Sequence, residues 1–492
     1  MIYFLLNSGG VMSIAFLVTI FLLMSYAVAF TAIVHCLLHS KYPQAALAWC
    51  GVIIMLPFLG AFFYFVFGIN RIDSKATKLF NQAVEARRRH LDSIRKNHWS
   101  SVQANHTREE YPIMGVGERS QGLSCVGGNT FEPLFNGDEA YPKMLEAIEN
   151  AEHYVFLSTY IFSGKRSGER FSEALIRAHK RGVMVHVIVD GLGTFWDFAF
   201  LRRKLKKAGV PVYSFIPFKL FPFQMSINLR NHRKLLICDS IAFTGGMNIA
   251  DGNLLKYHPR DSVQDVHFKC TGPIVTGLRE VFLLDLAFVT GKAQDMTFTP
   301  CSATGTMDAR IVMDGPGNSD DLIINLLCGV FSCAKKEIII INPYFLPTRE
   351  IISALMSAVT RGVRVRVILP EKLDHNFVSW AADHILPSLI HGGIEMYKQP
   401  KPFAHTKLIL VDEIYTFLGS TNFDPRSLKL NFELNLEVFS VQLNSYLRFF
   451  ADSVLASSKK IAYSVFEDGK FPFLIFLKRL RNAAMWIFSP YL

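Results

Sequence analysis

The first forty residues of the chain contain no Asp, Glu, Lys or Arg. Within them, the run from Val11 to Val34 is long enough to span a membrane, since about 20 apolar residues cross the hydrocarbon core. A second uncharged run extends from residue 43 to residue 70, after a short polar segment. We therefore expect a transmembrane helical hairpin over residues 1–70. The alternative, a cleaved signal peptide, would need a basic segment before a shorter apolar core.

The sequence also lacks paired cysteines. The eight cysteines are scattered and form no C-x-x-C pair. This spacing argues against a zinc site and against a disulfide framework. It is typical of a protein body in a reducing, cytosol-facing compartment.

Basic residues exceed acidic ones along the chain. The 52 Lys and Arg residues against 41 Asp and Glu residues give a net charge of +11. This balance favours a polyanionic partner, either nucleic acid or an anionic membrane surface. The basic stretch from Arg71 to Lys96 directly follows the expected hairpin, and by the positive-inside rule it places both termini in the cytoplasm. We expect residues 71–119 to form a basic connector, as a solvated helical linker or as a helix on the membrane surface.

After residue 120 the sequence alternates between helical patterns and short β-branched runs, which indicates α/β units. The same order of helix then strand appears in both halves, and RGVMVHVIV at 181–189 aligns with RGVRVRVIL at 361–369. A repeat of such a long period indicates two similar domains rather than a solenoid. We expect these domains to cover residues 120–295 and 296–465.

A second repeat carries chemistry. The order H-x-K-x-x-x-x-D occurs in NHRKLLICD and in AHTKLILVD, and its members are His232, Lys234, Asp239, His405, Lys407 and Asp412. On a strand, residues two apart share a face, so each histidine lies beside its lysine. Each aspartate follows its histidine by an odd number of positions, so we expect it on the opposite face. An ordinary buried strand with a satisfied histidine explains one copy, but two equivalent copies favour catalysis.

This doubled motif resembles the phospholipase D superfamily. Other stretches resemble bacterial cardiolipin synthases in particular: FGINR, AIENAEHYVFLSTYIF, TGGMNIADG, INPYFLP and GSTNFDPRSLKLNFELN. The resemblance implies two pseudo-twofold-related αβαβα sandwich domains with one active site between them. It also implies an α/β fold class for everything after the hairpin.

The resemblance further implies roles for individual residues. His232 is the expected nucleophile and His405 the expected general acid and base, although the two roles could be exchanged. The expected phosphate ligands are Lys234, Lys407, Asn248, Ser420 and Asn422, with no metal and no cofactor. Acidic residues of later strands hold the histidine rings in this family, which assigns Asp265 to His232 and Glu433 to His405.

The implied reaction is transfer of a phosphatidyl group between two phosphatidylglycerol molecules through a phosphohistidine, with release of glycerol. One alternative is a phospholipase D or transphosphatidylase with another donor or acceptor, such as phosphatidylethanolamine. Another is a membrane-tethered phosphodiesterase or nuclease, although we do not expect nucleic acid as a partner. Aromatic and basic residues in FIPFKLFPF (215–223) and in the tail 466–492 resemble interfacial segments, which bind an anionic membrane surface. The expected location is the bacterial inner membrane, as a multi-pass protein.

Overall fold

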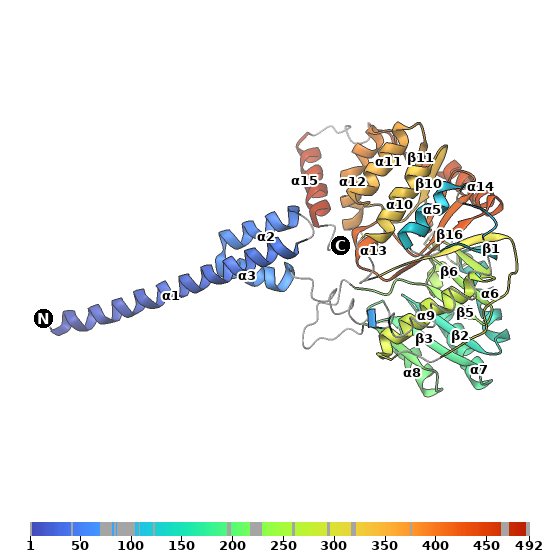
Figure 1. Cartoon of the computed structure of the whole chain (residues 1–492), viewed down its shortest axis with the longest axis horizontal. Helices are drawn as coiled ribbons and strands as arrows, with labels where there is room; N and C mark the ends of the chain where they lie inside the picture. Colours follow the sequence, from blue (N-terminus) through green and yellow to red (C-terminus); the bar gives the residue numbers. More distant parts are fainter. Residues whose placement is uncertain are drawn as a thin grey trace. The chain divides into compact units, whose positions relative to one another are not determined.

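A computed structural model describes most of the chain. The described residues are 2–40, 43–68, 81–82, 85, 104–107, 109–121, 124–193, 198–216, 229–257, 261–292, 296–315, 321–373, 376–463 and 472–488. They fall into two compact units, Met1–Ser74 and Lys75–Leu492. Figure 1 shows the elements of both units.

The first unit is helical and apolar. Helix α1 (Ile2–His39) contains Phe16–His39, which by length and composition can cross a membrane, with a mean hydropathy of 2.4. The second apolar run breaks at Leu56, between α2 (Pro43–Met55) and α3 (Pro57–Phe63). A π-helix, η1 (Tyr64–Gly68), follows. Since each piece is shorter than a span, the described part of this run, residues 43–68, does not form the single continuous spanning helix expected from its composition.

Helices α2 and α3 fold back on each other. A Cβ atom added to Gly60 of α3 would lie 2.5 Å from the carbonyl oxygen of Val52 in α2, so glycine permits this close approach. At the other end, the Tyr64 ring contacts Trp49 with a centroid distance of 5.6 Å. The Tyr64 hydroxyl also lies 2.8 Å from Nδ1 of His35 in α1, which pairs two polar groups inside the apolar unit.

Within its described residues, the second unit is built on one sheet of fifteen strands, and a separate pair of short strands lies outside that sheet. Its first half contributes β1 (Val126–Phe135), α6 (Asn136–Asn150), β2 (Tyr154–Thr159), α7 (Arg166–Lys180), β3 (Met184–Asp190), α8 (Ala199–Lys207), β4 (Val212–Phe215), β5 (Leu235–Cys238), β6 (Ile241–Gly245), η4 (Asp251–Asn253), β7 (Val263–Gln264), β8 (Val266–Thr271) and α9 (Ile274–Thr290). Its second half contributes β9 (Met307–Asp314), α10 (Leu322–Cys333), β10 (Glu337–Ile341), α11 (Arg349–Thr360), β11 (Arg364–Pro370), α12 (Asn376–His391), β12 (Glu395–Gln399), β13 (Phe403–Ala404), β14 (Leu408–Val411), β15 (Tyr415–Gly419), α13 (Pro425–Lys429), β16 (Glu433–Phe439), α14 (Val441–Ser457) and β17 (Lys459–Lys460). The helix–strand pairs expected in both halves are confirmed.

The order of strands reveals the duplication. From the centre outward, the first half runs β1-β8-β6-β5-β2-β3-β4, and the second runs β9-β16-β15-β14-β10-β11-β12-β17. The same order of strands therefore runs outward on either side of the antiparallel pair of β1 and β9. This arrangement confirms the α/β class and its pseudo-twofold relation, and it joins the two half-sheets edge to edge.

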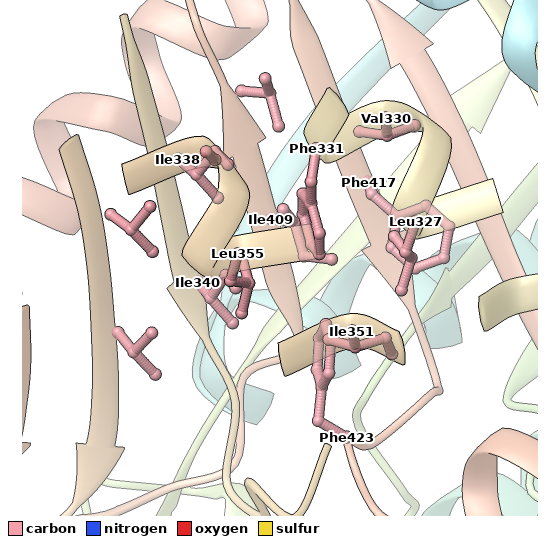
Figure 2. Close-up of a cluster of buried hydrophobic side chains, with 14 of the residues drawn as sticks. Leu327, Val330, Phe331, Ile338, Ile340, Ile351, Leu355, Ile409, Phe417 and Phe423 are labelled. Carbon is pink, nitrogen blue, oxygen red and sulfur yellow. The ribbon is translucent and has the colours of Figure 1, made fainter. Parts of the chain in front are cut away.

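Helices cover both faces of each half-sheet. In the first half, Val155 and Leu157 of β2 join the apolar core formed with α6 and α7. Between them, Phe156 points the other way and stacks on Phe282 of α9 with a centroid distance of 4.8 Å. Strand alternation thus supplies two helix-covered faces. In the second half, side chains of α10, α11, β10, β14 and β15 interlock around Phe331 in the same manner (Figure 2).

The segment before the first strand differs from the expected connector. Asn105 and His106 donate backbone N–H groups to the carboxylate of Asp308 in β9, at 2.8 and 2.9 Å. Helix α5 (Pro112–Gln121) then packs against α10, where Gly329 accommodates the side chain of Val116. Residues 104–121 are therefore part of the second half, and most of residues 71–103 lie outside the described chain. Sequence could not indicate this packing because the partners are about 200 positions away.

The last helix, α15 (Pro472–Phe488), packs against α12. Arg481 lies over the ring of Trp380 at 4.2 Å, and Trp486 contacts the ring of His384 at 5.0 Å. Within the stretch 215–223, Phe215 is fully buried against Phe288, so it is not an interfacial residue. Residues 217–223 lie outside the described residues.

Candidate active site

The two motif histidines line one cavity of about 260 Å³ between the halves. Its other lining residues include Tyr160 and Asn248 from the first half and Asn422 from the second. The two motifs therefore contribute to one shared site, as expected from the sequence.

Short strand pairings across the halves hold each histidine. The backbone N–H of His232 donates to the carbonyl of Phe432 at 2.9 Å, and the N–H of Phe432 donates to the backbone carbonyl of Arg230 at 2.8 Å. In the equivalent position, the N–H of His405 donates to Gln264 at 2.7 Å, next to the β7–β13 pairing. The backbone of each motif histidine is therefore hydrogen-bonded to a segment of the other half.

This pairing determines which carboxylate meets which histidine. Phe432 is followed by Glu433, whose two carboxylate oxygens each lie 3.1 Å from Nδ1 of His232. Gln264 is followed by Asp265, whose Oδ2 lies 2.8 Å from Nδ1 of His405. The assignment of Asp265 to His232 and Glu433 to His405 was therefore wrong, and the partners are exchanged between the halves. The resemblance identified both carboxylates but not the histidine that each one contacts.

Burial controls the protonation of this cluster. It lowers the pKa of His232 to about 4, against the opposing charge of Glu433, so the imidazole is neutral near pH 7. Burial, followed by the charge of Lys407, also lowers the pKa of His405. Burial opposes ionisation of Glu433, yet its pKa lies below the ordinary value because His232 and Lys234 stabilise the carboxylate. A neutral imidazole that donates Nδ1–H to a carboxylate presents a lone pair at Nε2.

The two lysines lie beside their histidines. Nζ of Lys234 donates to the carbonyl of His232 at 2.7 Å and lies 5.4 Å from the centre of the Tyr160 ring. Nζ of Lys407 donates to the carbonyl of His405 at 2.7 Å and lies 3.0 Å from its Nε2. Burial lowers the pKa of Lys234 well below its ordinary value, so an arriving anion would stabilise the charged form.

The motif aspartates do not join the cavity. Asp239 has a positive φ of 49°, and its carboxylate accepts the backbone N–H groups of Glu152, His153 and Tyr154 at the start of β2. Asp412 has a φ of 50° and does the same for the three residues that begin at Lys335. The expectation that these aspartates point away from the imidazoles is confirmed. Their carboxylates bind the backbone where β2 and β10 begin, although both aspartates were included among the candidate catalytic residues.

The expected phosphate ligands divide into two groups. Asn248 and Asn422 line the cavity, and among the described residues Oδ1 of Asn422 has no hydrogen-bond partner. Ser420 is fully buried and instead donates to the carboxylate of Glu433. The hydroxyl of Ser420 is therefore placed at Glu433, and its role as a phosphate ligand stays a prediction. At the equivalent point of the first half, Gly246 leaves room for Asp265, since a Cβ there would lie 2.6 Å from Oδ2.

The cavity also contains residues that sequence reasoning missed. Arg230 and Arg426 line it, and neither belongs to the H-x-K-x-x-x-x-D pattern. Arg233, inside the first motif, is buried and binds Asp285 of α9, as well as the carbonyl oxygen of Glu433 at 3.1 Å. Within the part of the chain that the structure describes, no cluster of His, Cys, Asp and Glu side chains could hold a metal ion.

Comparison with known proteins agrees with this geometry. Residues 144–266 and 327–453 match the family model described as cardiolipin synthase, PLD-like domain. Residues 27–68 match a model described as phospholipase D-nuclease N-terminal. One segment of the first match lies in each half of the sheet.

Individual relatives extend over nearly the whole chain. A cardiolipin synthase of Alkalihalophilus pseudofirmus is 30% identical, with 92% of this chain and 90% of the relative covered. Cardiolipin synthase 1 of Bacillus anthracis is 28% identical over 99% of this chain and 96% of its own.

Among solved structures, a phosphatidylserine synthase of Haemophilus influenzae Rd KW20 superposes with a TM-score of 0.60. It covers 76% of this chain and 100% of its own length, at 16% identity, and so supports the fold alone. The duplicated fold, the paired histidines and these relatives agree, and the chain belongs to the cardiolipin synthase family of phospholipase D-like phosphatidyltransferases.

Proposed function

We propose that this cardiolipin synthase joins two phosphatidylglycerol molecules by a double displacement at His232 and His405. The observation that carries the proposal is the pair of buried histidines lining one cavity, each with Nδ1 held by a carboxylate. Such a pair supplies a nucleophile and a proton donor on either side of one phosphorus atom.

In the first half-reaction, Nε2 of His232 attacks the phosphorus of a donor phosphatidylglycerol. The bond from phosphorus to the glycerol oxygen breaks, and a phosphatidyl group remains on the histidine. An anionic phosphodiester favours the protonated form of His405, which gives its Nε2 proton to the departing glycerol oxygen. His405 is neutral when glycerol leaves.

In the second half-reaction, the neutral His405 accepts the proton of a hydroxyl group on a second phosphatidylglycerol. The hydroxyl oxygen attacks phosphorus, the bond between phosphorus and Nε2 of His232 breaks, and cardiolipin forms. Lys234 and Lys407 stabilise the negative charge on the phosphoryl oxygens in both steps.

The test is to incubate the purified full-length protein with labelled phosphatidylglycerol and to resolve the lipid products, beside a His232→Ala variant. We expect cardiolipin and free glycerol from the wild type and neither from the variant. Phosphatidic acid without cardiolipin would instead indicate a phospholipase D. Parallel incubations with phosphatidylethanolamine and with a phosphodiester oligonucleotide test the other donor and the nuclease activity.

The proposed location is the cytoplasmic face of a bacterial inner membrane. The apolar α1 and the basic stretch that follows the first unit support it. Two arrangements follow from the break at Leu56. If α2 and α3 straighten there and cross as one helix, the protein is multi-pass with both termini cytoplasmic; if they keep the fold-back and re-enter one face, the amino terminus lies outside. A single cysteine introduced near residue 7 of a cysteine-free chain, labelled by an impermeant maleimide on intact cells, distinguishes the two.

We also propose that α15 lies on the membrane surface. Its exposed apolar side chains are Phe473, Phe476, Leu477, Leu480, Trp486 and Ile487, and it carries Lys478, Arg479 and Arg481. This combination suits a helix that binds anionic headgroups. Replacing Phe473, Phe476 and Leu480 with Ser should weaken binding of the protein without its first 74 residues to phosphatidylglycerol vesicles, if that part remains folded by circular dichroism. Unchanged vesicle binding of the folded variant would contradict the proposal.

A further inference from the structure

The active-site cavity contains two arginines that the double displacement does not use. Arg230 comes from the first half and Arg426, in α13, from the second. Arg230 is only 2% exposed, and its Nη1 donates to the carbonyl of Leu229 at 3.2 Å. Among the described residues, its Nε and Nη2 atoms have no hydrogen-bond acceptor. Buried guanidinium donors are usually hydrogen-bonded, so these atoms are available to an anionic ligand in the cavity.

The nearby carboxylates are already engaged. Asp190, whose charge favours the ionised form of Arg230, accepts three backbone N–H groups at 2.9 to 3.0 Å. Asp424 also lines the cavity, but its Oδ1 accepts the backbone N–H groups of Arg426 and Ser427. Burial and the charge of Arg426 lower the pKa of Arg230, with Asp190 opposing them. An anion between the two guanidinium groups would relieve this cost.

The arginines also break the pseudo-twofold symmetry. Two residues before each motif histidine, the first half has Arg230 where the second has Phe403. Four residues after each motif asparagine, the second half has Arg426 where the first has Gly252. Phe403 and Gly252 line an adjoining cavity of about 420 Å³, which shares Ile161, Asn248 and His405 with the first. A site duplicated in its histidines and lysines thus has arginines on one side only, which indicates a ligand present on one side only.

Tyr160 connects the arginines to the reacting centre. Its ring lies 5.2 Å from that of His232 between centroids, and Nζ of Lys234 lies over it. Burial and Asp190 raise the pKa of its hydroxyl, while the charges of Arg426 and Arg230 act in the opposite direction. Tyr160, His232 and the two arginines thus line the same cavity.

A donor phosphatidylglycerol has one phosphate, which the motif histidines and lysines serve. The acceptor brings another, one glycerol away from the hydroxyl that attacks. Guanidinium groups bind phosphodiesters through paired N–H donors. We propose that Arg230 and Arg426 form a second phosphate site, which binds the phosphodiester of the acceptor phospholipid while its hydroxyl attacks the phosphohistidine.

This inference rests on the proposed double displacement and adds its acceptor specificity. The attacking oxygen forms its bond to phosphorus as the bond to His232 breaks, and its proton passes to His405, as described above. The arginines take no part in that exchange. They favour a glycerol that carries a phosphate over free glycerol or water, and so direct the intermediate toward cardiolipin.

The experiment compares two soluble acceptors with the full-length protein and phosphatidylglycerol in mixed micelles. One is labelled glycerol, which regenerates phosphatidylglycerol; the other is glycerophosphoglycerol, the deacylated headgroup with its phosphodiester. For the wild type we expect a KM for glycerophosphoglycerol about 10-fold or more below that for glycerol. In Arg230→Gln and Arg426→Gln we expect the ratio of the two KM values and cardiolipin formation to fall by about 10-fold or more, and glycerol exchange to fall less than cardiolipin formation.

Controls separate the outcomes. Arg203→Gln, on the exposed surface of α8, should behave as wild type, and Arg230→Lys should keep part of the preference. Equal KM values for the two acceptors in the wild type would overturn the second phosphate site without any variant. A parallel loss of exchange and cardiolipin formation in folded variants would also overturn it. Absence of glycerol exchange in the wild type would instead overturn the double displacement and the inference with it.

Discussion

Nδ1 of His405 lies 2.8 Å from Oδ2 of Asp265, a residue of the other half of the chain. Glu433 reaches back to His232 in the same way, at 3.1 Å. Each half therefore supplies the carboxylate that fixes the tautomer of the other half's histidine. Duplication produced two similar halves, but a complete histidine–carboxylate pair exists only when they are joined. This exchange explains why one chain forms one active site.

Replacement of Asp239 by Asn should affect stability and leave the chemistry intact. Asn tolerates the positive φ at this position, but it loses charge-assisted hydrogen bonds to three backbone N–H groups. We expect a loss of about 1–3 kcal/mol in the free energy of unfolding, with kcat per folded molecule near the wild-type value. Thermal unfolding and cardiolipin formation measure the two effects. Asp412→Asn is the matched control, and a drop in kcat as large as that of Asp265→Asn would refute a structural role.

Arg233 should be important for stability although it touches no substrate in the proposed reaction. Its guanidinium binds Asp285 and the carbonyl oxygens of Glu433 and Asp314, so it joins α9 of the first half to strands of the second. Arg233→Gln leaves the carboxylate of Asp285 buried without its partner, which should cost about 3–5 kcal/mol. The double variant with Asp285→Asn should lose less than the sum of the two single variants, as measured by chemical denaturation. Additive losses would mean that the pair is not coupled.

His267 should make stability depend on pH below neutrality. Burial lowers its pKa to about 4, with Asp265 and Lys234 acting in opposite directions, whereas the unfolded chain binds the proton near pH 6.5. The unfolded state therefore binds more protons between these values, and the folded state loses stability as pH falls through this range. The loss should reach roughly 2 kcal/mol at pH 5 for this residue.

The matched variant for His267 is His267→Asn, which copies Asn435 at the equivalent place in β16. Its unfolding temperature should decline less between pH 7 and pH 5 than that of the wild type. Identical declines in both proteins would show that His267 does not contribute to the pH dependence.

Much of this structure could be predicted from local patterns. Helix and strand periods gave the elements around the repeated RGV segments, and strand alternation separated the histidine–lysine pair from Asp239. Contacts between distant segments could not be predicted in this way. The partner of His232 depends on the pairing of residue 231 with Phe432, and the place of α5 depends on packing against α10. Ser420 was expected near the phosphate from the family resemblance alone, whereas its hydroxyl donates to Glu433.

The exchange of carboxylates between the halves is tested most directly by burst kinetics with a phosphatidyl p-nitrophenyl ester. Nitrophenolate departs without a proton, so formation of the phosphohistidine needs the nucleophile and not the general acid. We predict that His232→Ala abolishes the burst and that Glu433→Gln slows it by about 10²–10⁴-fold. His405→Ala and Asp265→Asn should keep the burst. If His405 is the nucleophile instead, His405→Ala and Asp265→Asn lose the burst, and His232→Ala and Glu433→Gln keep it. A burst lost in His232→Ala and Asp265→Asn but kept in Glu433→Gln would contradict the account.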